Sequence, residues 1–357
     1  MLDYRKTVTR IVSLFLQINL SFGLQCLDQT GTPVDWYIVY KLPDISSNSN
    51  PIVKNGTAFY YMDEHNPSWI FSPKGMLDKN QAVYHTLQQI YTSASGSIAY
   101  MMYNDEPPFT RGYLTHGHTK GTVAFNKTSG FWLITSLPKF PYPKIDGYQY
   151  PESGSVYGQT FLCISMNYDL LDVLGSIFLY TYPMIYDHEL PTSYYKDNPN
   201  MVSILTGRQR HQITQPWSQE TLLVSTNKVN FRSFEKATNF HHDLYDGWLS
   251  SIFKAELLVE TWQNGKGDMG SNCTIPHKVY NIKQITFRDT EAITFHNSKD
   301  HSKWVVTKTD GNWVCIGDIN RQITQFKRGG GQVCFQNDSV WKAFSNLVTE
   351  VEQCKSS

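Results

Sequence analysis

The sequence predicts an α/β fold that contains two copies of one strand and helix pattern. Three observations support this prediction: segments typical of strands and helices alternate along the chain, a His-x-Lys tripeptide occurs once in each half, and similar strand, turn and helix patterns follow both tripeptides. The chain has 357 residues, of which 40% are hydrophobic and 17% are charged, so the composition is globular. This length allows about two domains.

The first repeat begins with a strand and a helix. Residues 34–40 are β-branched and aromatic and end shortly before Pro43, which predicts a buried strand. Apolar residues at helical spacing predict a helix over 81–91, and residues 97–103 are typical of another strand. The polar sequence around His118 follows this strand, and sheet proteins tend to build their sites at the ends of strands.

Both tripeptides are followed by the same pattern, which indicates an internal duplication. In the first repeat His118 precedes strands over 131–137 and 160–165 and a helix over 169–178. The second repeat, from His301, contains strands over 301–307, 312–319 and 333–335 and a helix over 339–351. The repeats differ in the lengths of predicted loops, where insertions are tolerated.

The region upstream of His301 matches the first repeat less closely. There we expect a strand over 222–231, a helix over 243–261 and a strand over 279–287. Four prolines in residues 181–216 predict an irregular connection. We therefore divide the chain into a leader over residues 1–23, an N-terminal repeat over 24–180 and a C-terminal repeat over 181–357.

Residues 1–23 are typical of a secretory signal peptide. Three basic residues precede a short, interrupted apolar run over residues 11–20, and the small residues Ser21 and Gly23 follow it. The run is too short to span a bilayer comfortably, and no later segment approaches the roughly 18 apolar residues of a membrane helix. We therefore expect passage through the secretory pathway without membrane insertion.

The charge balance depends on pH. The whole chain has 31 basic and 31 acidic residues, which excludes a protein that holds a polyanion through bulk positive charge at neutral pH. Without residues 1–23 the chain keeps 28 basic and 30 acidic residues and all 11 histidines. At about pH 5 most histidines with ordinary pKa values are protonated, so the net charge becomes positive.

The cysteines and sequons agree with a secreted chain. Six cysteines remain after the leader, an even number without a Cys-x-x-Cys pair, so we expect three disulfides. The spacing of the cysteines leaves their pairing open. Glycosylation sequons occur at Asn55, Asn126, Asn272 and Asn337.

Each tripeptide places an imidazole beside an ammonium group. In an extended segment residues i and i+2 point to the same face, so His118 lies beside Lys120 and His301 lies beside Lys303. If the repeats pack about a pseudo-twofold axis, the two pairs meet in one cleft. The lysines can then bind the oxygens of a phosphodiester, while one imidazole attacks phosphorus to form a phosphohistidine and the other protonates the leaving oxygen. This chemistry needs no metal and no cofactor.

Two other interpretations of nearby segments are weaker. His116 and His118 could both be metal ligands, but Lys299 occupies the position of the second repeat that matches His116. The basic, glycine-rich segment from Lys327 to Gly331 could contact a phosphate backbone, although such a segment between two strands is more often a turn.

A specific combination of short segments runs along the chain: PVDWYIVYKLP (33–43), YNDEPP (103–108), HGHTKG (116–121), GFWLITSLPKFP (130–141), YGQTFLCIS (157–165), DLYDGWL (243–249), SNCT (271–274), DHSKW (300–304), WVCIGDINR (313–321) and RGGG (328–331). Together they resemble the deoxyribonuclease II family, whose fold belongs to the phospholipase D superfamily. The resemblance covers nearly all of the chain after the leader. It implies a pseudodimer of two duplicated mixed-sheet domains flanked by helices, each with one His-x-Lys motif.

The resemblance also implies an activity and its residues. The family hydrolyses double-stranded DNA in the lysosome at acid pH without a metal, and leaves 3′-phosphate and 5′-hydroxyl ends. The implied catalytic residues are His118, Lys120, His301 and Lys303. Asn320 matches a family segment and is expected to orient the neighbouring imidazole. The implied disulfides join Cys26 to Cys163, Cys273 to Cys354, and Cys315 to Cys334.

Two alternative functions remain at this point: hydrolysis of another phosphodiester, such as a phospholipid, and DNA binding without catalysis. The paired His-x-Lys motifs argue against the second. The sequence leaves open which histidine is the nucleophile, whether RNA or single strands are cut, and whether the protein is a monomer or a homodimer.

Overall fold

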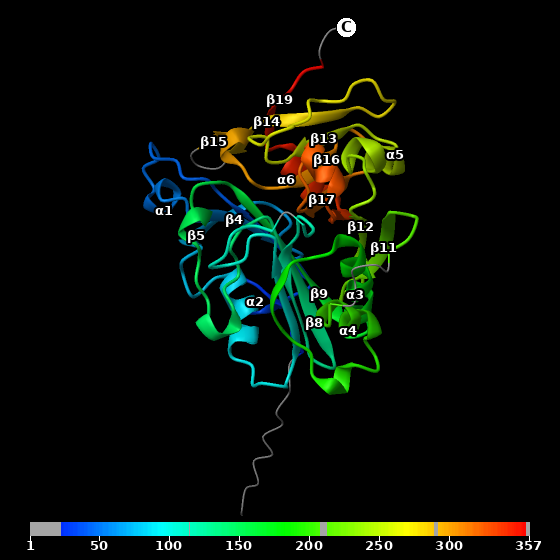
Figure 1. Ribbon diagram of the computed structural model, residues 1–357. Coiled ribbons are helices and arrows are strands. Elements are labelled where there is room, and N and C mark those ends of the chain that lie inside the picture. The colour runs from blue at the N-terminus through cyan, green and yellow to red at the C-terminus, as the bar shows by residue number, and fades with distance from the viewer. Residues whose placement is uncertain (1–22, 114, 208–212, 289–291, 355–357) are drawn as a thin grey trace, which may run out of the picture.

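A computed structural model describes residues 23–113, 115–207, 213–288 and 292–354. It has two large sheets with few helices, which confirms the α/β class (Figure 1). The predicted leader lies outside the described residues apart from Gly23. No helix in the described part of the chain is long and apolar enough to cross a membrane.

The first sheet has eight strands, all from residues 36–189. In spatial order they are β10 (Ile185–Glu189), β6 (Ala99–Asn104), β7 (Lys120–Phe125), β8 (Ser129–Thr135), β9 (Gln159–Asn167), β3 (Trp36–Lys41), β4 (Ala58–Asp63) and β5 (Ile70–Gly75). Every neighbouring pair is antiparallel, so the prediction of a mixed sheet is wrong for this half. Hairpin-like connections allow antiparallel neighbours, whereas parallel neighbours need a long crossover.

The second sheet has nine strands and is mixed. Its spatial order is β11 (Ser218–Val224), β12 (Asn230–Lys236), β18 (Gly330–Gln336), β17 (Trp313–Gly317), β16 (Trp304–Thr307), β13 (Leu257–Glu260), β14 (Val279–Arg288) and β15 (Ala292–His296), and β19 (Val348–Val351) also pairs with β14. Only the neighbours β13 and β14 are parallel among the described pairs.

Five strands occupy equivalent places in the two sheets. The order β6-β7-β8-β9-β3 in the first corresponds to β13-β16-β17-β18-β12 in the second. Lys120 is the first residue of β7, and Lys303 directly precedes β16, so each His-x-Lys tripeptide leads into the equivalent strand. The two tripeptides therefore occupy matching positions in the two sheets.

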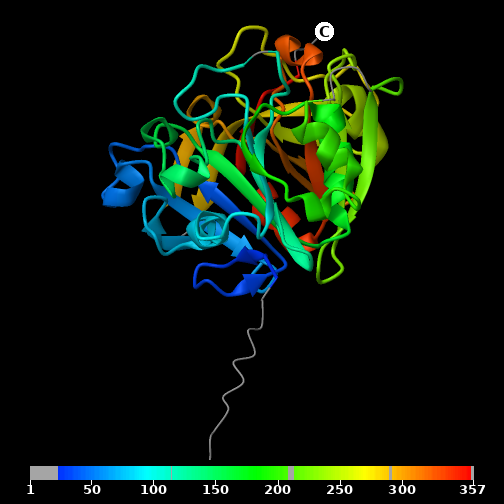
Figure 2. The same cartoon turned by 60° about the horizontal axis from the view of Figure 1, so that its bottom comes forward.

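The sheets pack against each other through a central core, and two smaller cores lie on their outer faces, where residues 82–91 cover the first sheet and residues 244–253 cover the second (Figure 2). The central core contains side chains from both sheets, as in the contact of Trp36 with Phe335, whose ring centroids are 5.6 Å apart. The helices α3 (Leu170–Thr181) and α6 (Asp338–Ser345) add side chains to this core. The remaining helices are α1 (Pro51–Lys54), α2 (Ala82–Tyr91), α4 (Pro199–Leu205), a π-helical turn (Tyr245–Leu249) and α5 (Ser250–Phe253). Short 3-10 turns span Lys144–Asp146, Glu152–Gly154, Thr192–Tyr194, Asn297–Lys299 and Ile323–Lys327.

Three local predictions for the second half need correction. The single strand over 222–231 is a hairpin of β11 and β12, because the backbone turns where Ser225 N–H donates to Val229 O. The helix over 243–261 ends at Lys254, whose φ of +51° is left-handed, and β13 follows. The helix over 339–351 ends at Ser345, and the β-branched residues after it pair with β14 as β19.

The connection over 181–216 is partly regular. It contains β10, which pairs with β6, and α4, which packs on α3. The predicted repeat boundary after residue 180 therefore precedes the last strand of the first sheet.

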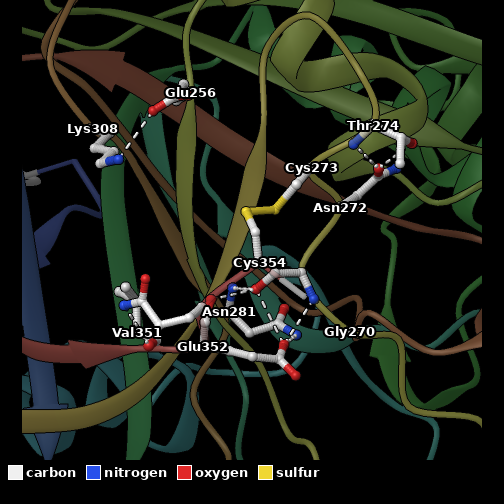
Figure 3. The surroundings of a disulfide bond; sticks show 12 residues. Glu256, Gly270, Asn272, Cys273, Thr274, Asn281, Lys308, Val351, Glu352 and Cys354 are labelled. Carbon is white, nitrogen blue, oxygen red and sulfur yellow. Dashed lines mark hydrogen bonds and ion pairs between the residues drawn. A yellow bond between two sulfur atoms is a disulfide. The ribbon is translucent and has the colours of Figure 1, made fainter. Parts of the chain in front are cut away.

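The six cysteines form the three disulfides that the resemblance implies. Cys26–Cys163 ties β1 (Cys26–Leu27) to β9, and Cys315–Cys334 joins directly opposite residues of β17 and β18. Cys273–Cys354 joins the segment before β14 to the residues after β19, beside a hydrogen bond from Asn281 to Glu352 (Figure 3).

The four sequons differ in their surroundings. Asn55 is exposed, whereas the asparagines at 126, 272 and 337 are partly buried. The Asn272 side-chain amide donates to Asp246 Oδ2 at 2.8 Å. Occupancy of the sequons stays a prediction.

Candidate active site

The structure brings both His-x-Lys tripeptides to the contact between the two sheets. His118, Lys120 and Lys303 are buried, and His301 is half-buried. His118 N–H donates to Gly329 O, directly before β18, and His301 N–H donates to Gly158 O, directly before β9; both distances are 2.8 Å. Each tripeptide is thus held by the main chain of the other sheet.

The imidazoles are held in the same reciprocal way. His118 Nδ1 is hydrogen-bonded to Asp318 O, which directly follows β17. His301 Nδ1 lies 3.0 Å from Ser136 O, which directly follows β8, and 3.3 Å from Gln159 Oε1. Carbonyl oxygens only accept hydrogen bonds, so these contacts favour a neutral imidazole that carries its proton on Nδ1 and a lone pair on Nε2.

Close approach of the main chain requires glycine beside each tripeptide, at Gly158 next to the loop of His301 and at Gly117 directly before His118. A Cβ on Gly158 would lie 2.4 Å from Asp300 Oδ1, and a Cβ on Gly117 would lie 1.9 Å from Thr181 O. Any other residue at either position would push the neighbouring histidine loop out of place.

The four predicted site residues act on each other electrostatically. Burial lowers the pKa of His118 well below its ordinary value, and the Lys120 and Lys303 ammonium groups lower it further. Burial and then Lys303 lower the pKa of His301 in the same way, with added contributions from Lys120 and His118. The two motifs therefore lie close enough to interact electrostatically across the contact between the sheets.

The first half of the site contains an ion-pair cluster that sequence reasoning did not assign. Asp105 Oδ1 accepts from Lys120 Nζ, and Asp105 Oδ2 accepts from the Arg328 guanidinium at 2.8 Å and lies 4.0 Å from His118 Nε2. Burial raises the pKa of Asp105, but the cations of Lys120, His118 and Arg328 outweigh burial and hold it below its ordinary value. Asp105 and Arg328 belong to the family segments YNDEPP and RGGG. The sequence suggested a phosphate contact or a turn for the segment of Arg328 and no role for Asp105, and the ion pair between them was not predicted.

The second half of the site has different neighbours. The indole of Trp262 contacts the His301 ring, with centroids 5.2 Å apart, and Lys303 Nζ lies 3.0 Å from His301 Nδ1. Asp300 accepts hydrogen bonds from the Tyr40 hydroxyl and the Ser302 hydroxyl, and so ties this loop to β3. No carboxylate contacts the His301 imidazole among the described residues, so the two histidines are chemically inequivalent.

The structure also shows the contacts of three other residues that the sequence analysis named. Asn320 is buried and makes no hydrogen bond to either imidazole in the described chain, where its Oδ1 has no partner; its orienting role stays a prediction. His116 stacks on Tyr182 at 4.6 Å, and no group of three or more metal-ligating side chains occurs in the described residues. The Arg328 side chain faces Asp105 and the loop that carries His118.

A small cavity of about 20 Å³ lies between the two sheets, next to Thr119 and Asp318. Four of its lining residues carry buried oxygens without a protein partner in the described chain: Thr119, Thr181, Glu235 and Gln332. Burial raises the pKa of Glu235 to about 8 from its ordinary 4.5, even though hydroxyl groups of Ser233 and Thr221 lower it. Glu235 is therefore protonated in acid.

Glu235 makes stability depend on pH. Between pH 4.5 and about 8 the unfolded chain loses this proton while the folded protein keeps it, so the free energy of unfolding falls as the pH rises. The slope approaches about 1.4 kcal/mol per pH unit at most. Glu235→Gln removes this slope, so we expect the variant to gain stability relative to the parent from about pH 5 to about pH 8. Urea unfolding at several pH values measures this, with the exposed Glu350→Gln as control; parallel curves would contradict the expectation.

Each half of the chain supplies one ammonium group and one imidazole. This combination suits chemistry at phosphate groups. Ammonium groups stabilise the negative charge that develops on phosphate oxygens, and imidazoles can attack, donate and accept protons. The fold and the site together define the class as a hydrolase of phosphate esters.

Comparison with known proteins narrows this class. The chain belongs to the deoxyribonuclease II family, because the family model of deoxyribonuclease II matches residues 25–354. It is 40% identical to plancitoxin-1 of Acanthaster planci over 95% of both chains. It is 37% identical to deoxyribonuclease-2-alpha of Rattus norvegicus, over 93% of this chain and 95% of the relative, and 35% identical to human deoxyribonuclease-2-beta, over 93% and 92%. The chain is therefore an enzyme, a nuclease of the deoxyribonuclease II type.

Proposed function

We propose that this protein is an acid endonuclease that hydrolyses double-stranded DNA without a metal or cofactor and leaves 3′-phosphate and 5′-hydroxyl ends. The observation that carries the proposal is the reciprocal bonding of His118 and His301 to matching carbonyls of the opposite sheet. The shared order of five strands supports a phospholipase D-like pseudodimer with one motif from each half.

The inequivalent surroundings of the histidines support a division of roles. Burial lowers the pKa of both imidazoles, but the Asp105 carboxylate, 4.0 Å from His118 Nε2, raises the pKa of His118 against this effect. Of the two histidines, His118 therefore takes a proton on Nε2 more readily, which suits a general acid. His301 Nε2, without a neighbouring carboxylate, suits a nucleophile. In the first step His301 Nε2 forms a bond to phosphorus, the bond from phosphorus to the 5′ oxygen breaks, and His118 gives its proton to that oxygen. In the second step water attacks the phosphohistidine and gives a proton to His118, which releases the 3′-phosphate.

The leaving group provides the test of these roles. A p-nitrophenyl phosphodiester has a leaving group that needs no proton, so His118→Ala should still release p-nitrophenol in a burst of about one equivalent per site. His301→Ala should give no burst. When the phosphodiester is labelled at phosphorus, the reaction is stopped with a denaturing alkaline quench and the protein is digested. The label should then be found on His301. A label on His118, or on neither histidine, would overturn the assignment.

The site of action follows from the same chemistry. We propose that the protein enters the secretory pathway and works in the lysosome, where it degrades DNA from engulfed or apoptotic cells. The signal-like residues 1–23, the three disulfides and the gain of positive charge in acid support this location. Fractionation of cells that express the tagged protein tests it; recovery in the cytosol would refute it.

A further inference from the structure

The loop between β6 and β7 runs from Asp105 to the first tripeptide and is firmly held at its base. Tyr113 N–H donates to Asp105 O at 2.6 Å, and Lys139 N–H donates to Glu106 O at 2.8 Å. Pro107 and Pro108 are buried. Proline restricts φ, so these contacts and the two prolines give the loop a rigid stem.

The second half of the molecule also holds this loop. The Arg328 guanidinium donates to the carbonyl oxygens of Tyr113 at 3.3 Å, His116 at 3.0 Å and Gly117 at 3.1 Å. Arg328 thus fixes the main chain at Tyr113, His116 and Gly117 from the second half of the molecule.

The tip of the loop exposes two aromatic rings and a guanidinium. Phe109 is 75% exposed and Tyr113 is 38% exposed, and Arg111 between them is also exposed. The φ of Phe109 is +64°, a region that bulky residues rarely adopt. Its ring contacts the edge of Tyr142 at 5.2 Å. Burial of Phe109 does not explain this strained backbone, and strain of this kind collects at functional sites.

The stem of the loop lies close to the reacting groups. Asp105, at the stem, is bonded to Lys120 and lies 4.0 Å from His118 Nε2. A strand whose phosphate contacts His118 and Lys120 therefore passes the stem from which the loop projects. Alternating aromatic and cationic side chains match such a strand, because bases stack on aromatic rings and guanidinium groups pair with phosphates.

We propose that Phe109, Arg111 and Tyr113 form a platform on which a nucleobase next to the scissile phosphodiester stacks. This inference rests on the proposed function. It names the ligand of the loop as an unstacked base of the substrate strand, and it makes this loop a determinant of DNA affinity and not of the chemical step.

The test compares DNA with a small phosphodiester. We expect Phe109→Ala to raise KM for DNA about tenfold, in line with the loss of one stacked base, and to leave kcat on DNA unchanged. Hydrolysis of bis(p-nitrophenyl) phosphate should also stay unchanged. Phe109→Trp should restore the KM for DNA. Leu222→Ala removes a similarly exposed side chain, 59% exposed on β11, and should have no effect.

A binding experiment separates this inference from the proposed function. A single strand with 2-aminopurine next to the central phosphate is titrated with the His118→Ala protein and with the His118→Ala/Phe109→Ala protein. Stacking predicts quenched fluorescence with the first protein and loss of quenching with the second. Equal quenching, an unchanged KM, or an equal loss on both substrates would overturn the platform. Failure of the parent protein to cleave DNA, with Phe109-dependent quenching intact, would overturn only the proposed function.

Discussion

His118→Ala and His301→Ala, made separately, are each expected to abolish plasmid cleavage at about pH 5 with EDTA present. General acid catalysis is worth about 10²–10⁴ in rate, and loss of the nucleophile removes the covalent route altogether. Neither imidazole can replace the other, because only His118 lies near the Asp105 carboxylate. Conversion of supercoiled to nicked and linear plasmid, followed over time with purified protein, measures the loss.

The control for this pair is His65→Ala. The side chain of His65 is 71% exposed and contacts only Glu64 as an ion-pair partner among the described residues, so its loss should leave cleavage intact. Circular dichroism checks that each variant is folded. Cleavage retained by either site variant would rule out the mechanism with two histidines.

Arg328→Ala is expected to reduce both stability and activity. The substitution leaves the buried Asp105 carboxylate with fewer cations and frees the carbonyl oxygens of the loop that carries His118. Removal of one partner of a buried ion pair costs about 3–5 kcal/mol, so we expect a loss of that size in the free energy of unfolding. We also expect kcat to fall at least about tenfold, because a small displacement of His118 disturbs the reacting geometry.

Two further variants make this prediction specific. Arg328→Lys keeps the charge without the planar fork of donors and should recover only part of the stability. Arg232→Ala removes an arginine from a partly exposed pair with Glu220 and should cost at most about 1 kcal/mol. If Arg328→Ala instead raised only KM for DNA and left stability unchanged, Arg328 would contact phosphate and not Asp105.

Local sequence patterns predicted much of the fold correctly. The strand over 34–40 is β3 and the helix over 81–91 is α2, because a β-branched run and helical apolar spacing are local signals. The errors occur where tertiary pairing overrides local preference. Residues 348–351 continue an apparently helical segment but pair with β14 instead.

The ionisable residues of the candidate site could be predicted from the sequence. Their hydrogen-bond partners could not. His118, Lys120, His301 and Lys303 stand out because a tripeptide repeats at matching places. Ser136 and Asp318 contact the imidazoles through main-chain carbonyls, which every residue type possesses, so no residue pattern marks them. These two carbonyls accept hydrogen bonds from the imidazoles because they lie directly after β8 and β17, where the opposite sheet comes into contact.

The family, the cysteines available for disulfides and the two His-x-Lys tripeptides could all be read from the residues alone. Which of the two histidines has a carboxylate neighbour depends on how the sheets pack. Asp105 and Arg328 are 223 residues apart, and they meet only because the two sheets pack face to face. Electrostatic interactions depend on distance in space and on burial, so packing alone makes two identical motifs chemically different.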